Sequence, residues 1–143
     1  MSRSLLVQSL NLDLKSLLRY ISTMKPEHYL TLAKNASRKS AHAQHRMGCV
    51  IAKGNKVLGV GYNVNKTHPK SPHFFKTVHA EFMAAINAGY EIEGATVYVF
   101  RQIKDGTPAM AKPCQSCWKF LYECGVKEVV YSFQGSFKHE RIK

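Results

Sequence analysis

Acidic residues are scarce in this sequence. Its 143 residues include 9 Asp and Glu against 21 Lys and Arg, which gives a formal net charge of +12. No acidic residue occurs from His28 to Ala80, whereas nine basic residues do. A positive field of this size attracts phosphate groups, whether they belong to a free nucleotide or to a polymer. The alternative is a solvated basic face that only aids solubility, because net charge concerns partners and not fold.

Long hydrophobic runs are missing as well. The longest uninterrupted apolar segments have only a few residues, as at Val97–Phe100, so we expect no membrane-spanning segment. The chain has four cysteines, too few for a disulfide scaffold, and two of them form Cys114-x-x-Cys117. This usage indicates reduced thiols for metal or redox chemistry, and we therefore expect a cytoplasmic protein.

Internal repeats, low-complexity tracts and Pro/Gly-rich linkers are also absent, so the sequence predicts one main domain. We expect an N-terminal helical extension over residues 1–25, followed by the domain over residues 26–143. Apolar residues spaced by three and four predict an amphipathic helix within the extension, from Asn11 or Asp13 to Thr23.

The rest of the chain alternates between helical and extended patterns. Two β-rich runs flank Gly54-Asn55 and predict a hairpin. Gln134-Gly135 is too short for a helical crossover, so the last two strands must form an antiparallel C-terminal hairpin. This order is typical of an α/β layer architecture with helices on the faces of one sheet. The expected elements are a helix from Pro26 to about Lys39, strands Met47–Lys53 and Lys56–Asn63, a helix from about Val78 to Ala88, strand Thr96–Arg101, a helix from about Cys114 to Cys124, and strands Val126–Phe133 and Ser136–Ile142, with loops at Val64–Thr77 and Gln102–Lys112.

Two short motifs carry candidate chemistry, His79-Ala80-Glu81 and Pro113-Cys114-Gln115-Ser116-Cys117. Each alone is weak: a helical histidine is more often a core or surface residue, and a lone Cys-x-x-Cys is also found in redox dithiols and structural zinc sites. Together they are more specific, because each begins a predicted helix and a strand lies between the two helices. If both helix N-termini meet at one sheet edge, His79, Cys114 and Cys117 offer one nitrogen and two thiolates to a zinc ion.

The number of ligands indicates catalysis. Three protein ligands with an open fourth position are typical of catalytic zinc, whereas structural zinc sites use four protein ligands. Zinc lowers the pKa of bound water toward ~7. Glu81, two residues after the histidine, is placed to move a proton of that water rather than to bind the metal. The other cysteines, Cys49 and Cys124, are expected in the core.

The motif pair resembles the His-x-Glu and Pro-Cys-x-x-Cys signature of zinc-dependent nucleobase deaminases, the cytidine and deoxycytidylate deaminase family. Arg46–Ile51 with Gly59–Asn63 is similar to the first hairpin of the deoxycytidylate and tRNA adenosine deaminase branches. Gly125–Tyr131 resembles the strand that follows their zinc helix. The resemblance covers about Pro26 to Tyr131.

That resemblance implies a three-layer α/β/α cytidine-deaminase-like fold around a central mixed sheet of about five strands. It implies zinc on the histidine and two cysteines of the motifs, with Glu81 as the proton shuttle. It also implies that Asn63 hydrogen-bonds the sugar of a substrate and that the backbone N–H of Ala80 contacts the carbonyl of the base.

Three functions stay open on the sequence. The first is hydrolytic deamination of a free cytosine nucleotide, with dCMP the preferred candidate, and the second is deamination of cytosine or adenine in a polynucleotide. The third is a non-catalytic zinc-containing nucleic-acid-binding protein, against which an intact Glu81 weighs. We also expect a homo-oligomer. Three segments depart from the known branches and therefore bear on the choice of substrate: Val64–Thr77, Gln102–Lys112 and Lys112-Pro113. The first segment contains four side chains that could either stack on a base or pack in the core: His68, His73, Phe74 and Phe75.

Overall fold

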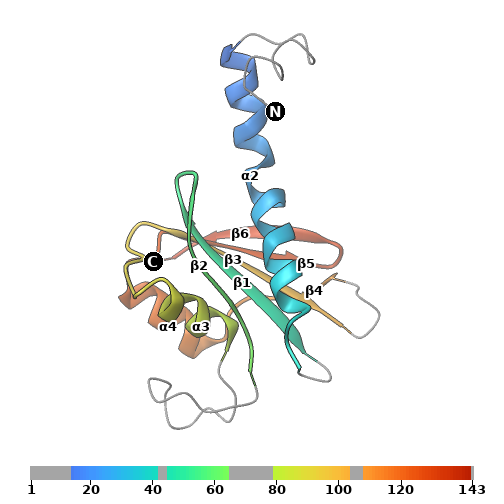
Figure 1. The fold of residues 1–143 in the computed structure, drawn as a ribbon, viewed down its shortest axis with the longest axis vertical. Coiled ribbons are helices and arrows are strands. Elements are labelled where there is room, and N and C mark those ends of the chain that lie inside the picture. The colour runs from blue at the N-terminus through green and yellow to red at the C-terminus, as the bar shows by residue number, and fades with distance from the viewer. Residues whose placement is uncertain (1–13, 42–44, 65–78, 104–107, 143) are drawn as a thin grey trace.

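A computed structural model describes residues 14–41, 45–64, 79–103 and 108–142 of the chain. Figure 1 shows one sheet with helices on both of its faces. The elements are helices α2 (Leu14–Ser37), α3 (Ala80–Asn87) and α4 (Gln115–Glu123), and strands β1 (Arg46–Lys53), β2 (Lys56–Tyr62), β3 (Thr96–Gln102), β4 (Pro108–Ala109), β5 (Glu128–Phe133) and β6 (Ser136–Arg141). Within these residues no helix is long and apolar enough to cross a membrane.

The sheet is mixed. Its strands follow the order β2-β1-β3-β5-β6, and β4 pairs with the free end of β3. The β3–β5 pair is parallel, and the β1–β2, β1–β3, β3–β4 and β5–β6 pairs are antiparallel. The β5–β6 pairing confirms the predicted C-terminal hairpin. Gln134 and Gly135 both adopt positive φ there, at 44° and 82°, as the tight turns that match the twist of paired strands require.

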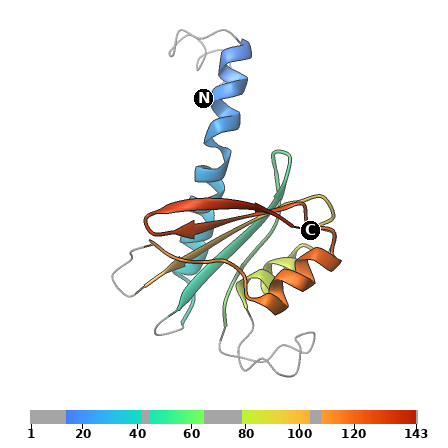
Figure 2. The same ribbon diagram turned by 180° about the vertical axis from the view of Figure 1, so that it is seen from behind.

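Three layers result, because successive side chains of the central strands point to opposite faces. On β1, Cys49 and Ile51 are buried against α3 and α4, whereas Val50 and Ala52 are buried against α2. The side chains of strand β3 also alternate between the two faces of the sheet. Because helices cover both faces, this strand is apolar from Val97 to Phe100. Figure 2, from behind, shows α3 and α4 together on the face opposite α2. The expected three-layer fold is confirmed.

The predicted break before Pro26 is wrong. One helix, α2, runs from Leu14 to Ser37 and includes the proline. Proline removes one backbone hydrogen bond from a helix, but the flanking Leu, Lys, Arg and Met residues are good helix formers. Only the second half of α2 lies on the sheet (Figure 1), where Tyr29, Leu30 and Ala33 are buried. The division of the chain at residue 25 stays a prediction.

The predicted loop Gln102–Lys112 is also wrong in part. Strand β3 extends to Gln102, and Pro108–Ala109 returns as β4, so that Arg101 pairs with Ala109. A two-residue strand has no periodicity to detect in the sequence. The pairing with β4 matters because it fixes the end of β3 beside the cavity described below.

Helix α3 lies unusually close to the β1–β2 hairpin. A Cβ atom added to Gly61 would lie 2.4 Å from the backbone N of Ala84, and one added to Gly59 would lie 2.3 Å from the Ala84 carbonyl oxygen. Only glycine leaves room for a helix backbone at this distance. The close approach fixes α3 on the sheet and sets the depth of its first turn, which carries the His79-Ala80-Glu81 motif.

Candidate metal centre and active-site cavity

Both motifs lie at helix N-termini. His79 immediately precedes α3 and Cys114 immediately precedes α4, each with extended backbone. Their carbonyl oxygens accept the first helical hydrogen bonds, from Met83 N–H (3.1 Å) and Trp118 N–H (2.8 Å). Because both helices lie on one face of the sheet and begin at the same end, the motifs meet in space.

The structure brings the three predicted metal ligands together. His79 Nδ1 lies 3.2 Å from Cys117 Sγ and 3.7 Å from Cys114 Sγ. All three donor atoms lie within 4.8 Å of one another. In a tetrahedral zinc site a nitrogen and a sulfur ligand are about 3.6 Å apart, given usual zinc–ligand bond lengths. The donor set and its spacing therefore fit a zinc ion.

Burial differs among the ligands. Cys117 is buried, His79 is half-buried and Cys114 is exposed. Burial, followed by the nearby Glu81 carboxylate, raises the pKa of the Cys117 thiol. Since zinc binds the thiolate, metal binding must release the proton of Cys117 and is favoured by rising pH.

Glu81 lies in the first turn of α3 and is only 1% exposed. Its Oε1 atom is buried and has no hydrogen-bond partner among the described residues. Burial raises the pKa of this carboxyl, and His79 and a hydrogen bond from Cys117 offset part of that effect. An unpaired buried carboxylate oxygen is costly, so its position beside the ligand cluster indicates a polar group bound there during function.

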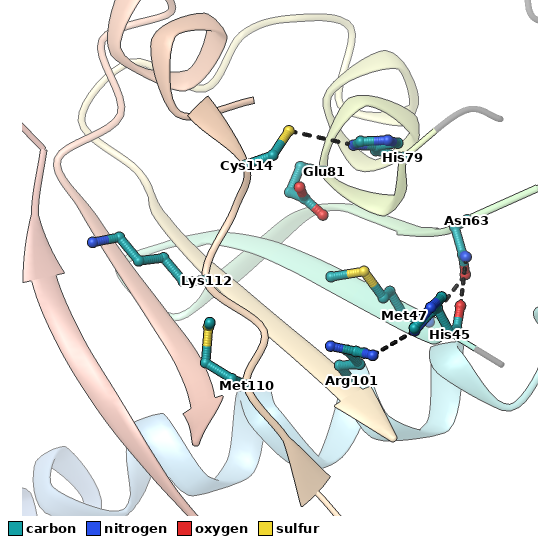
Figure 3. A pocket seen from close by; sticks show the side chains of 9 residues that line it. All are labelled: His45, Met47, Asn63, His79, Glu81, Arg101, Met110, Lys112 and Cys114. Atoms are coloured by element: carbon teal, nitrogen blue, oxygen red, sulfur yellow. Dashed lines mark hydrogen bonds between the residues drawn. The ribbon is translucent and has the colours of Figure 1, made fainter. Parts of the chain in front are cut away.

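A cavity of about 380 Å³ opens onto these residues. Figure 3 shows its lining, with His79 and Cys114 on one side and His45 and Arg101 on the other. Its volume lies within the range of small-molecule sites. The lining residues are His45, Met47, Asn63, His79, Glu81, Arg101, Met110, Lys112 and Cys114.

Asn63 lines the cavity, but its side chain is committed to the backbone. Its Oδ1 accepts the N–H of Met47 (3.0 Å), and its Nδ2 donates to the carbonyl of His45 (2.7 Å). In this arrangement Asn63 fixes the segment that enters β1. Ala80 is fully buried as the first residue of α3. Contacts of Asn63 with a sugar and of Ala80 with a base stay predictions.

The sequence did not predict that three basic residues line the site: His45, Arg101 and Lys112. Arg101 ends the apolar run of β3 and hydrogen-bonds through Nη2 to His45 Nδ1. Lys112 pairs with Glu140 (3.0 Å) and lies 5.2 Å from the ring centre of Trp118. A charged residue directly after four apolar strand residues was the available signal for Arg101.

The remaining candidates have separate outcomes. Cys49 is fully buried, and Cys124 packs against the same core, as expected. Trp118 is partly buried against this core. His68, His73, Phe74 and Phe75, with most of the predicted loop Val64–Thr77, lie outside the described residues.

The fold and this donor set define an α/β protein of the cytidine-deaminase-like class with a site for a metal ion. The family model described as cytidine and deoxycytidylate deaminase zinc-binding region matches residues 23–133. The chain belongs to this family, and zinc is accordingly its cofactor.

The individual relatives have low sequence identity to this chain. The human protein named deoxycytidylate deaminase is 26% identical over 125 residues, which cover 74% of this chain and 63% of that protein. The chain thus spans less than two thirds of the length of this relative. Among solved structures, cytidine deaminase from Burkholderia pseudomallei has a TM-score of 0.61 at 23% identity, covering 81% of this chain and 91% of that chain. The dCMP deaminase of cyanophage S-TIM5 in apo form has a TM-score of 0.55 at 22% identity, covering 74% and 80%. Both structures support the fold.

Proposed function

We propose that this protein is a zinc-dependent hydrolytic deaminase that converts a cytosine nucleotide to its uracil form and releases ammonia. One observation carries the proposal: the His79, Cys114 and Cys117 donor atoms lie within 4.8 Å of one another beside the buried Glu81 carboxylate, whose Oε1 atom has no hydrogen-bond partner among the described residues. A purely structural metal site has no use for such a carboxylate, which argues against the non-catalytic alternative.

We assign His79, Cys114 and Cys117 as the residues that hold zinc. When bound, zinc supplies a Lewis acid that lowers the pKa of water enough for nucleophilic attack near neutral pH. Cys114 and His79 border the cavity directly, so a substrate in the cavity can reach this centre.

Glu81 would act as both base and acid. Its carboxylate takes a proton from the attacking water as the C–O bond forms at the ring carbon that bears the exocyclic amine, and the electron pair of the ring C=N double bond moves to the ring nitrogen. The acid then gives this proton to the amine nitrogen, the C–N bond breaks as ammonia leaves, and the proton of the remaining hydroxyl group moves to the ring nitrogen to give the uracil form. Burial raises the pKa of the Glu81 carboxyl. The carboxyl therefore holds the proton more readily until the second step, in which the proton passes to the amine.

The cavity supports a free nucleotide as the preferred substrate, with dCMP ahead of a polynucleotide. Its volume of about 380 Å³ suits one nucleotide. The named human relative acts on deoxycytidylate, as its name states. A polynucleotide remains the second candidate because the net charge of +12 would also favour a longer anion. The homo-oligomeric state and the cytoplasmic location stay predictions from the sequence.

The test is to incubate the zinc-loaded protein with dCMP, CMP, deoxycytidine, cytidine and single-stranded oligonucleotides, and to measure uracil products and ammonia. We expect dCMP to be converted, with a Michaelis constant that rises only mildly with salt, because a monophosphate makes few contacts. Single-strand binding should instead weaken with a slope of about −0.7 per phosphate contact. Conversion of an oligonucleotide with strong salt dependence, and none of dCMP, would favour the second candidate.

A further inference from the structure

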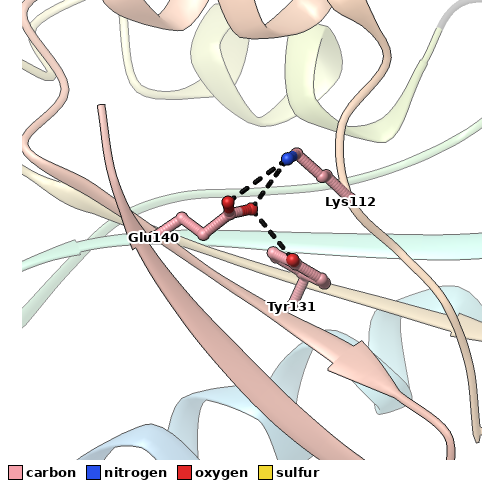
Figure 4. Close-up of polar contacts among 3 residues, drawn as sticks. All are labelled: Lys112, Tyr131 and Glu140. Carbon is pink, nitrogen blue, oxygen red and sulfur yellow. Dashed lines mark hydrogen bonds and ion pairs between the residues drawn. The ribbon is translucent and has the colours of Figure 1, made fainter. Parts of the chain in front are cut away.

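A lysine and an arginine line the cavity, and among the described residues only the lysine has a carboxylate partner within ion-pair distance. Lys112 Nζ lies 3.0 Å from Glu140 Oε2, and the same carboxylate accepts a hydrogen bond from Tyr131 (2.8 Å), as Figure 4 shows. The ion pair therefore balances the charge of Lys112. For Arg101, the described residues provide no carboxylate within ion-pair distance.

Arg101 also has an unused donor. Its Nε atom is buried and makes no hydrogen bond with any described part of the chain. A buried guanidinium N–H without an acceptor costs more than a typical hydrogen bond contributes. The natural acceptor for such a group is an anionic oxygen, and phosphate matches the planar fork of arginine.

The position of Arg101 is well fixed. It pairs with Met47 of β1 and Ala109 of β4, and its backbone N–H donates to Ser132 Oγ (3.1 Å). Its Nη2 hydrogen-bonds to His45, whose carbonyl oxygen is held by Asn63. A cation held on the sheet in this way loses little conformational freedom when it binds an anion.

Arg101 and the ligand cluster face the cavity from opposite sides (Figure 3). A nucleotide likewise has its base at one end and its phosphate at the other. With the base beside Glu81, the phosphate would lie toward Arg101. We propose that Arg101, oriented by His45, binds the 5′-phosphate of a free cytosine nucleotide and so selects nucleotides over nucleosides. This inference rests on the proposed function for the position of the base.

The test compares two substrates that differ only in the phosphate, dCMP and deoxycytidine. In the zinc-loaded Arg101→Gln variant, kcat/KM for dCMP should fall roughly 10- to 100-fold, mainly through KM, as expected for loss of a charge-assisted hydrogen bond. The value for deoxycytidine should stay nearly unchanged. Arg101→Lys, which keeps the charge but not the fork, should fall between the two.

Lys56→Gln is the matched control. It removes one positive charge from the exposed β1–β2 turn, at the end of β1 remote from Met47 and the cavity. This variant should keep the wild-type ratio of the two kcat/KM values. Zinc content and thermal unfolding of each variant show whether it is folded and loaded.

Binding distinguishes failure of this inference from failure of the proposed function. Calorimetry should show that wild type prefers dUMP to deoxyuridine and that Arg101→Gln loses this preference, whether or not dCMP is turned over. Equal losses for dCMP and deoxycytidine, or an unchanged preference in the variant, would overturn the phosphate assignment. A preference for oligonucleotide over dCMP that depends on Arg101 would overturn the choice of a free nucleotide.

Discussion

His79 Nδ1 lies 3.2 Å from Cys117 Sγ, although the two residues are 38 positions apart in the sequence. His79 immediately precedes helix α3 and Cys117 lies in helix α4, and strands β3 and β4 lie between these helices in the chain. The contact exists because both helices pack on the same face of the sheet. Stability and metal binding should consequently depend on each other.

The ligand cysteines provide the first prediction. Purified protein should contain about one zinc per chain, and Cys117→Ser should lose the metal and unfold at a lower temperature than wild type. A site that is absent from the unfolded chain adds its binding free energy to folding. Metal analysis and thermal unfolding with and without a chelator provide the measurement.

Cys124→Ser is the control for that experiment, because Cys124 packs against the core and is not one of the clustered ligands. It should keep its zinc and remain sensitive to the chelator. A folded, active Cys117→Ser protein without metal would contradict the assignment of Cys117 as a ligand.

Glu81→Gln should separate catalysis from metal binding. The amide has the shape of the carboxyl but cannot carry the proton, and acid–base catalysis typically contributes about 10²–10⁴-fold in rate. We expect normal zinc content with a kcat reduced to that extent, measured as uracil formation. Full activity would refute the proton-transfer role.

Asn63 should matter through the segment that it holds. Asn63→Ala removes hydrogen bonds to His45 and Met47 and should lower the free energy of unfolding by about 1–3 kcal/mol. Denaturant unfolding measures this change. Because His45 orients Arg101, the KM for dCMP should rise as well, while zinc content should not change. Wild-type stability and KM would show that neither bond is important.

Glu140 should make the stability of the protein fall more steeply as the pH is lowered. Hydrogen bonds from Lys112 and then Tyr131 lower the pKa of this carboxyl below its ordinary value of 4.5. Its contribution is therefore fully present above that value and is lost as the pH falls through the lower, folded-state pKa. Urea unfolding from pH 7 to pH 3 should show Glu140→Gln less stable than wild type at neutral pH. The two proteins should converge in acid, and a constant difference across this range would contradict the prediction.

Gly61 tests the close approach of α3 to the sheet. Gly61→Ala would place a Cβ atom 2.4 Å from the Ala84 backbone N, so the helix must shift. Overpacking of this kind typically costs about 1–3 kcal/mol. Val60→Ala, at the adjacent exposed position, is the control and should have a much smaller effect. Activity should fall in the glycine variant alone, since the shift would move Glu81.

Much of the fold follows from the sequence. Both hairpins were predicted because each turn, Gly54-Asn55 and Gln134-Gly135, is too short for any other connection. The motifs at 79–81 and 113–117 predicted the ligand cluster, since local helix starts and ligand spacing are written in consecutive residues. The order of helices and strands predicted an α/β layer architecture, and the resemblance to the deaminase family implied that it has three layers.

Other features were decided only by the tertiary structure. Helix α2 continues through Pro26, where good helix formers on both sides outweigh one lost hydrogen bond. Arg101, His45 and Lys112 come from separate segments that no local pattern joins, and pairing between β1, β3 and β4 brings the first two together. The neutralisation of Lys112 by Glu140 depends on the β5–β6 hairpin. Chemistry carried by short motifs was thus determined by the sequence, whereas the charge of the cavity depends on long-range pairing that only the folded sheet supplies.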